Sequence, residues 1–224
     1  MYDASGSIPS DVRIRKFAAA DLLRCVEIAT EVWPDVPESM TREEMTRLMK
    51  AYVEDSRIMS TRQEVACVSD EVVGVIFGSI EGGMGPGDRI RISVLRLYIW
   101  LRFVAHGRTS VLKRSSVLMK SIVTELKLIK ARPETDAEVS LLLVSHDHRG
   151  KGIGRLLMGR FLQEARSKSA RTATVYSTDP GCNWHFYEIC GFRKVGGFDD
   201  NLVSFVQGVD TKGLVFAIDL QSST

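Results

Sequence analysis

The sequence predicts an α/β fold over residues 1–224, taken as a single domain, and three observations support it. Of the 224 residues, 44% are hydrophobic, so the chain can bury one substantial core. Segments with strand-like alternation and segments with helical spacing follow one another along the chain. An apolar run, Val139–Val144, ends at a polar tetrad, after which come three glycines at alternate positions and a helical pattern. This order predicts a strand, a tight loop and a helix N-terminus.

The amino-terminal part is expected to form a strand, two helices and a hairpin. Val12–Phe17 alternates as a half-buried strand does, and Asp21 is expected to cap the helix that follows. Thr41 begins a capping-box pattern that opens a second helix. Two runs, Glu64–Val68 and Val72–Ile80, are separated by three polar residues and predict a hairpin.

A basic segment, residues 82–136, separates this hairpin from the central strand. Between Arg89 and Arg132 there are eleven Lys or Arg residues and one acid, Glu125, which gives a net charge of +10. Because the whole chain carries +2, the remainder carries about −8. The segment is therefore predicted to be an insertion that differs in charge from the rest of the chain.

The insertion is expected to be helical. Ile92–Ala105 is apolar on nearly all sides, and Val111–Ile129 has one apolar stripe, so we expect two helices. We expect them to cover the sheet and shape a pocket wall, with their basic faces in solvent. A membrane-surface contact or a homodimer contact is the alternative. Nucleic acid is not expected as a partner, because the insertion has neither a DNA-binding motif nor a clean basic stripe.

The carboxy-terminal part should complete the sheet. The helix after the glycine loop should run to about Lys168, and Ala173–Ser177 suits the next strand. Trp184–Glu188 suits a short helix. Phe192–Val195 and Leu214–Leu220 are expected to be the closing strands.

Composition favours a cytoplasmic protein. The first residues have no basic head followed by an apolar run, and no stretch reaches the roughly twenty apolar residues of a membrane span. The spacing of the cysteines does not suit zinc, and we expect free thiols and no metal site. They are Cys25, Cys67, Cys182 and Cys190.

The loop Arg149–Gly154 is suited to binding phosphate. The first turn of a helix presents unpaired N–H groups at the positive end of the helix dipole. Glycine lets an anion approach these groups and permits positive φ angles, while Arg149 and Lys151 add positive charge. A dinucleotide fingerprint fails because Arg155 stands where its third glycine belongs, and a nucleotide P-loop fails at Gly159–Phe161.

Two motifs point to one family. The pattern Arg-x-x-Gly-x-Gly after an apolar strand resembles the acyl-CoA pyrophosphate loop of the GNAT superfamily of N-acyltransferases. The segment Cys182–Phe192 resembles the Asn…Tyr-x-x-x-Gly-Phe segment that follows the next strand in that superfamily. The resemblance implies a mixed, mostly antiparallel central sheet flanked by helices, with the helical insertion before the central strand. It also implies transfer of an acetyl group from acetyl-CoA, as co-substrate, to a primary amine by direct attack in a ternary complex.

The same resemblance implies cofactor-binding residues. The central strand should splay from its neighbour, so that the pantetheine arm pairs with backbone groups of Leu143 and Val144. Asn183 should hydrogen-bond the pantetheine, although the commoner family spacing places this Asn farther upstream. The amides of the loop should hold the pyrophosphate. The loop residues are Arg149, Gly150, Lys151, Gly152, Ile153, Gly154 and Arg155.

The resemblance also implies two catalytic residues. Tyr187 matches the family tyrosine that protonates the departing thiolate, and a phenol with a reference pKa near ~10 keeps its proton at neutral pH. The alternative is a tyrosine that only packs in the core. Glu138 resembles a carboxylate that deprotonates the amine in some members, and its alternative is an edge carboxylate in solvent. His146, His148 and His185 are expected to help neutralise charge rather than to catalyse.

The acceptor amine cannot be identified from the sequence. It depends on the pocket formed by the two early helices and the insertion, and neither has a recognisable signature. A second hypothesis is a non-catalytic acyl-CoA sensor that docks a partner or a membrane through the basic insertion.

Overall fold

The computed structural model describes residues 11–33, 36, 40–80, 86–105, 111–179 and 184–221. In chain order its elements are β1 (Arg13–Lys16), η1 (Ala19–Asp21), α1 (Leu22–Val32), α2 (Arg42–Ile58), β2 (Arg62–Val68), β3 (Glu71–Ile80), α3 (Pro86–Ala105), α4 (Val111–Ala131), β4 (Ala137–Val144), η2 (His146–His148), α5 (Ile153–Ser167), β5 (Thr172–Asp179), α6 (His185–Ile189), β6 (Arg193–Asp199), α7 (Asn201–Gln207) and β7 (Lys212–Asp219).

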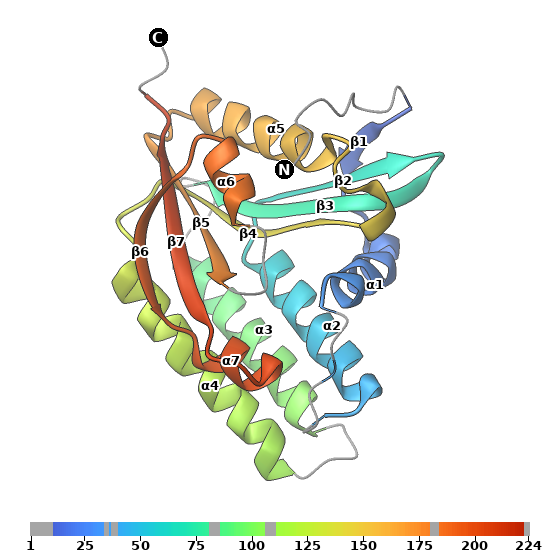
Figure 1. Ribbon diagram of the computed structural model, residues 1–224, viewed down its shortest axis with the longest axis vertical. Helices are drawn as coiled ribbons and strands as arrows, with labels where there is room; N and C mark the ends of the chain where they lie inside the picture. The colour runs from blue at the N-terminus through green and yellow to red at the C-terminus, as the bar shows by residue number, and fades with distance from the viewer. Residues whose placement is uncertain are drawn as a thin grey trace.

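The described strands form one seven-stranded sheet in the order β1-β2-β3-β4-β5-β7-β6. Every neighbouring pair is antiparallel except β4 and β5, which are parallel. The predicted α/β fold with a mixed, mostly antiparallel sheet is therefore confirmed. Figure 1 shows α5 on one face of this sheet and α1 and α2 on the other, with α3 and α4 extending beyond them next to β6 and β7.

A β-bulge in β4 divides the core between the two faces of the sheet. Ser140 is the extra residue, because Leu141 pairs with Phe77 while Val139 pairs with the next residue of β3, Gly78. Val139 consequently packs in the core under α5, whereas Leu141 packs in the core against α1 and α2. Gly78 is needed there, because a Cβ atom would lie 2.5 Å from the ring of Phe161. The bulge turns the second half of the central strand toward the amino-terminal helices.

The two early helices begin differently from one another. The capping box of α2 is confirmed, since the side chain of Thr41 accepts from the amide of Glu44 and the Glu44 carboxylate accepts from the amide of Thr41. The predicted capping role of Asp21 is wrong. Its carboxylate accepts both Nη groups of Arg15, at 2.6 and 2.8 Å, and the amide of Ala18 instead of an amide of α1. A guanidinium on the adjacent strand offers a two-pronged charged partner, which outcompetes the neutral amides of the helix.

The two helices expected in the basic insertion are present as α3 and α4, and α3 begins six residues before the expected start. Their basic faces are not simply solvated. Arg96 binds Asp55 of α2 and Glu125 of α4, and Arg102 binds Glu54 of α2. Part of the positive charge of the insertion is thus paired with acids elsewhere in the fold.

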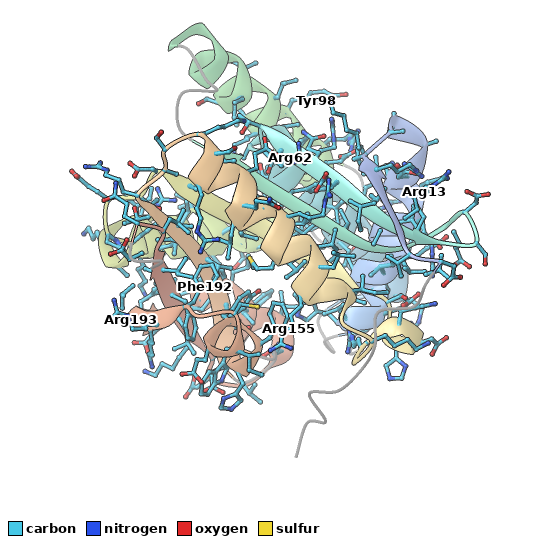
Figure 2. The ribbon with its side chains drawn as sticks, turned by 90° about the horizontal axis from the view of Figure 1, so that it is seen from above. Arg13, Arg62, Tyr98, Arg155, Phe192 and Arg193 are labelled. Carbon is cyan, nitrogen blue, oxygen red and sulfur yellow. The ribbon has the colours of Figure 1, made fainter. Side chains whose placement is uncertain are left out.

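The outward faces of these two helices are apolar instead. The exposed large side chains are Val94, Leu95, Leu97, Tyr98 and Leu101 on α3, and Met119, Ile122, Leu126 and Ile129 on α4. Figure 2 places Tyr98 at the edge of the molecule. Among the described helices, none combines the length and hydropathy needed to cross a bilayer.

The last three strands, β5, β6 and β7, are longer than predicted, and α7 was not predicted at all. Its ends nevertheless carry recognisable signals. The side chain of Asp200 accepts hydrogen bonds from the first-turn amides of Leu202 and Val203, each at 2.9 Å. Gly208 follows the helix with φ +70°. Three of the four cysteines are free as expected, at positions 25, 67 and 190, and Cys182 lies outside the described residues.

Candidate active site

The expected splay of the central strand is present. The parallel strands β4 and β5 pair only at Ala137–Ala173, Glu138–Thr174 and Val139–Val175. Beyond these pairs the strands separate, so the backbone of β4 from Ser140 to Val144 has no partner on the β5 side. A pocket of about 810 Å³ occupies this gap and extends to α2, α3, α4 and α7. An extended ligand can enter there as a substitute strand.

The glycine loop stands at one end of this pocket. Gly150 and Gly152 have φ of +76° and +77°, in the left-handed region that favours glycine. Gly152 is the N-cap of α5 and supplies no side-chain cap, so the first-turn amides, which have no acceptor within the helix, remain available. Gly154 lies against α6, where a Cβ atom would be 3.4 Å from the ring of Phe186. The loop therefore presents backbone N–H groups at the mouth of the gap.

The basic side chains of the loop do not all face the gap. The Nε of Arg149 donates to the carbonyl of Val144 at 3.2 Å, which ties the loop back to the end of β4. Lys151 and Arg155 are exposed, and Figure 2 shows Arg155 near the start of α5. Leu143 is buried and Ile153 is fully packed in the core under the sheet. Any ligand contact of these last two residues would be made by their backbone.

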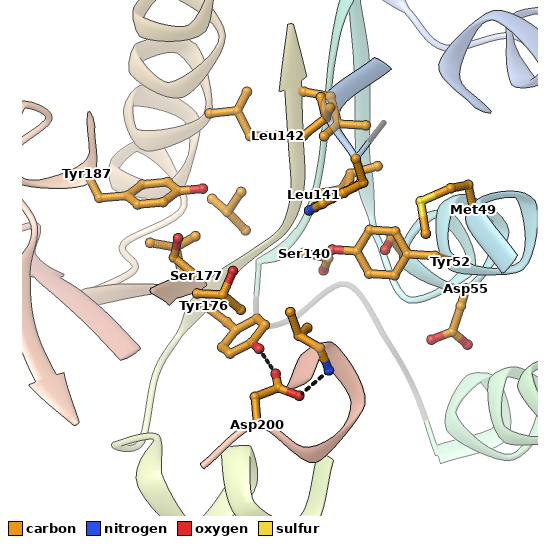
Figure 3. Close-up of a pocket in the computed structure, with 18 of the residues that line it drawn as sticks. Met49, Tyr52, Asp55, Ser140, Leu141, Leu142, Tyr176, Ser177, Tyr187 and Asp200 are labelled. Atoms are coloured by element: carbon orange, nitrogen blue, oxygen red, sulfur yellow. Dashed lines mark hydrogen bonds between the residues drawn. The ribbon is translucent and has the colours of Figure 1, made fainter. Parts of the chain in front are cut away.

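Tyr187 lies on α6 with its ring in an aromatic cluster. Its ring centroid is 5.4 Å from that of Phe186, 6.2 Å from that of Phe192 and 5.9 Å from that of Phe216. Figure 3 shows its hydroxyl directed into the gap between β4 and β5. The tyrosine therefore combines core packing of the ring with a hydroxyl in the pocket. Asn183 lies outside the described residues.

Glu138 lies on β4 and lines the pocket, but its carboxylate is bound by the guanidinium of Arg132 at the end of α4. Its side chain is only 21% exposed, so it is not an edge carboxylate in solvent. Of the histidines, His148 lines the pocket and its Nδ1 is 3.0 Å from the hydroxyl of Ser145. His146 and His185 are exposed beside Asp147 and Glu188. In the described part of the chain, no group of three or more His, Cys, Asp or Glu side chains is arranged to hold a metal.

The part of the pocket lined by α2, α3 and α4 contains charged residues that the sequence prediction did not single out. Arg96 bridges Asp55 and Glu125, with its Nε 2.9 Å from one Asp55 oxygen and its Nη1 2.7 Å from Glu125. Burial raises the pKa of Asp55, and the bonds from Arg96 oppose this rise. Burial would lower the pKa of Arg96, but Glu125 and Asp55 together raise it above its ordinary value. These residues lie on three helices far apart in the sequence, and no local pattern connects them.

Three more polar residues line the pocket near the splay. Asp200 is fully buried and accepts the hydroxyl of Tyr176. Ser177 is 4% exposed, and its Oγ has no hydrogen-bond partner among the residues that the structure describes. The polar run that ends β5, Ser177–Asp179, could have indicated Ser177, whereas no sequence signal pointed to Asp200 as a residue of the pocket. Figure 3 shows Asp200 beside the hydroxyl of Tyr176.

Comparison with known proteins gives the family. The model of the Acetyltransferase (GNAT) family matches residues 24–192. The comparison with curated proteins finds no match. One similar solved structure is Ard1 from Thermoplasma volcanium, with 16% identity and a TM-score of 0.55; the match covers 93% of this chain and 97% of that chain. A second is the ribosomal-protein-S18-alanine N-acetyltransferase from Escherichia coli, with 9% identity, a TM-score of 0.54 and coverage of 95% of this chain and 96% of that chain. A third is yncA from Salmonella typhimurium, solved with its cofactor acetyl-CoA, with 16% identity, a TM-score of 0.54 and coverage of 96% of this chain and 97% of that chain. At these identities the structures show the fold alone. Because the family model covers well over half of the sequence, the chain belongs to the GNAT family of acetyltransferases.

Proposed function

We propose that this protein transfers the acetyl group of acetyl-CoA to a primary amine, by direct attack of the amine in a ternary complex. The observation that carries the proposal is the gap between β4 and β5, which joins the glycine loop at the start of α5 to the hydroxyl of Tyr187. Membership of the family supports the same chemistry. Acetyl-CoA supplies a thioester whose acyl carbon an amine can attack.

The residues of the gap fit acetyl-CoA. The amides between Gly150 and Arg155 suit a diphosphate, because they meet at a helix N-terminus without side-chain caps. The edge of β4 at Leu143 and Val144, which β5 does not pair with, suits the amides of a pantetheine arm. The hydroxyl of Ser177, which no described residue bonds, offers one more partner inside the pocket. Asn183 remains a prediction.

Three proton movements accompany the transfer. An alkylammonium with a reference pKa near ~10.4 must lose a proton before its nitrogen can attack, and the nitrogen loses a second proton as the amide forms. The departing sulfur gains one proton, so one proton is released overall. The hydroxyl of Tyr187 faces the gap and can supply the proton to the sulfur. Glu138, the sequence-based candidate for the base, has its carboxylate engaged by Arg132, which leaves less of it available to the amine.

The experiment compares the wild-type protein with Tyr187→Phe, following free thiol released from acetyl-CoA in the presence of a panel of amines. We expect amine-dependent CoA release by the wild type and a loss of ~10²–10⁴-fold in kcat for the variant, with an unchanged Kd for acetyl-CoA. Tyr98→Phe, on the outer side of α3, is the matched control and should keep the wild-type rate. Absence of both CoA binding and amine-dependent release in the wild type would remove the proposed function.

A second candidate is a non-catalytic acyl-CoA sensor that docks an anionic membrane through the insertion. The exposed apolar side chains of α3 and α4 favour it, whereas the internal ion pairs of Arg96, Arg102 and Arg132 leave less charge for such a surface. It predicts that Tyr187→Phe keeps the biological output and that the protein sediments with anionic vesicles. Leu97→Ser with Leu101→Ser should abolish that sedimentation. A homodimer and a cytoplasmic location stay predictions.

A further inference from the structure

We propose that Tyr176 and Asp200 form the site that receives the protonated acceptor amine and takes up its proton. This proposal rests on the proposed function and names the base within it. The pair replaces Glu138 in that role, and the ligand class it implies is a primary alkylammonium.

Asp200 is a buried carboxylate that accepts four hydrogen bonds from the described residues, all from neutral donors. One oxygen accepts the hydroxyl of Thr124 on α4 at 3.0 Å and the amides of Leu202 and Val203, each at 2.9 Å. The other oxygen accepts the hydroxyl of Tyr176. Figure 3 draws these bonds to Tyr176 and to the start of α7. The side chain is therefore held in one position between three elements.

No basic side chain of the described residues is bonded to Asp200. Lys127 lies at the same corner, but its Nζ binds the carbonyl of Asp199 at 2.9 Å and the side-chain oxygen of Asn201 at 2.7 Å. A buried charge normally pairs with an opposite charge, because desolvation without one is costly. The lining of the pocket thus carries a negative charge for which the described part of the fold supplies hydrogen bonds but no cation. A cationic ligand would supply the missing positive charge.

Tyr176 connects this charge to the reaction gap. It is the first residue of β5 beyond the last β4–β5 pair, Val139–Val175, so it stands where the strands begin to separate. Its ring stacks on Phe198 at a centroid distance of 5.9 Å. Tyr187 of α6 and Tyr176 of β5 line the same pocket, and Figure 3 shows the hydroxyl of Tyr176 turned toward Asp200. An amine held at Tyr176 would therefore lie in the pocket that also contains the hydroxyl proposed to protonate the sulfur.

The proton transfer balances in charge and atoms. A hydroxyl oxygen that donates its own proton to a carboxylate keeps acceptor capacity for an N–H group. One N–H bond of the alkylammonium breaks and its proton moves to the oxygen of Tyr176, while the phenolic proton of Tyr176 moves to Asp200. The ammonium and the carboxylate both become neutral, and the nitrogen lone pair is free to attack. Asp200 returns its proton along the same path to water after the transfer.

The remainder of the acceptor side indicates what the amine carries. Asp55 and Glu125 share the single guanidinium of Arg96, which leaves a further negative charge at that wall. Met49 and Tyr52 line the space between this network and the gap. An apolar stem fits these walls, and a carboxylate on the acceptor would be repelled. We therefore expect hexylamine to be acetylated with a kcat/KM at least tenfold higher than that of 6-aminohexanoate.

Other charged groups near Tyr176 and Asp200 could also contribute to the pH profile, and their contribution must be distinguished from that of the pair. On α4 these are Lys127 and Glu125, and at the edges of β6 and β7 they are Asp199 and Lys212, which form an ion pair. Across the pocket lies Asp55, bound to Arg96, and α7 carries no charged side chain. Asp55→Asn tests whether that network contributes to the profile.

The test measures kcat/KM for hexylamine from pH 6 to pH 10 in the wild type, Tyr176→Phe and Asp200→Asn. Phe keeps the ring that stacks on Phe198, and Asn caps a helix about as well as Asp, so both variants should fold. We expect a loss of ~10²-fold or more at pH 7 in each variant. The loss should shrink about tenfold per pH unit as the free amine deprotonates in solution, while the Kd for acetyl-CoA stays unchanged.

The controls separate this proposal from its alternatives. Tyr187→Phe should show a loss that a rise in pH does not recover, because the sulfur still lacks its proton donor. A wild-type kcat/KM and pH profile in Tyr176→Phe would overturn the proposal, as would a pH-recoverable loss confined to Glu138→Gln. If the wild type binds no CoA and acetylates no amine, the proposed function fails instead. Equal use of hexylamine and 6-aminohexanoate would refute the inferred ligand class alone.

Discussion

The need for glycine at the left-handed position 150 of the loop can be tested with a matched pair of substitutions. Gly150 has φ +76°, and a Cβ atom built on it meets no atom of the described residues within 4 Å. Gly159 lies within α5, and its Cβ position is equally open. Gly150→Ala and Gly159→Ala therefore add the same methyl group to open space. Any difference between the two variants must come from the backbone.

The expected effects have opposite signs. An L-residue in the left-handed region costs ~1–2 kcal/mol, so Gly150→Ala should destabilise the fold by that amount. Alanine is better than glycine inside a helix by ~1 kcal/mol, so Gly159→Ala should stabilise it. For a domain of this size ~1 kcal/mol corresponds to ~2–4 °C in Tm. Gly150→Ala should lower Tm by ~2–8 °C, and Gly159→Ala should raise it by ~2–4 °C.

The ligand adds a second readout. If the loop relieves the strain at residue 150 by rotating a peptide group, a bound diphosphate loses one backbone N–H donor. A hydrogen bond to a charged group is worth ~1.5–3 kcal/mol. The Kd for CoA should then rise by roughly 10–150-fold in Gly150→Ala and stay at the wild-type value in Gly159→Ala. Thermal unfolding followed by circular dichroism and titration calorimetry with CoA measure the two effects. Equal Tm shifts in the two variants, or wild-type CoA affinity in Gly150→Ala, would refute the reasoning.

Two further predictions concern stability. The hydrogen bond from Arg15 lowers the pKa of Asp21 in the folded protein below 3.8. The Arg15–Asp21 pair therefore stabilises the fold above ~pH 3.8, and this stabilisation is lost as the pH falls through the lower pKa of the folded state. Asp21→Asn should cost ~1–3 kcal/mol in urea unfolding at pH 7 and much less at pH 3, whereas Asp70→Asn, at the exposed pair with Arg13, should change stability by under ~0.5 kcal/mol at either pH. Equal losses in the two variants would contradict this. Thr41→Ala removes the N-cap of α2 and should cost ~1 kcal/mol, or ~2–4 °C in Tm; an unchanged Tm would show that the cap is dispensable.

Local features of the chain were predictable because each depends on neighbouring residues. The strand Val139–Val144, the glycine loop and the helix after it were expected from an apolar run, three glycines and helical spacing, and all are present. The capping box of α2 is likewise contained within four residues. The predicted capping role of Asp21 was wrong because its partner is not a neighbouring residue of the helix. Its carboxylate had an alternative partner on β1, and the choice between amides and a guanidinium is made by packing.

The sequence by itself thus determined the family, the sheet with its helices, and the loop whose amides face the gap. The tertiary structure alone decided which charged and polar side chains meet in the pocket. It places Asp200 against Tyr176, 24 residues away, binds Glu138 to Arg132, and brings Arg96 to Asp55, 41 residues away. Such pairings depend on the β4 bulge, on the strand register and on how helices cross, which are set by the packing of the whole core. A pattern of residue types along the chain records which groups are present, and only the packed fold brings them within bonding distance.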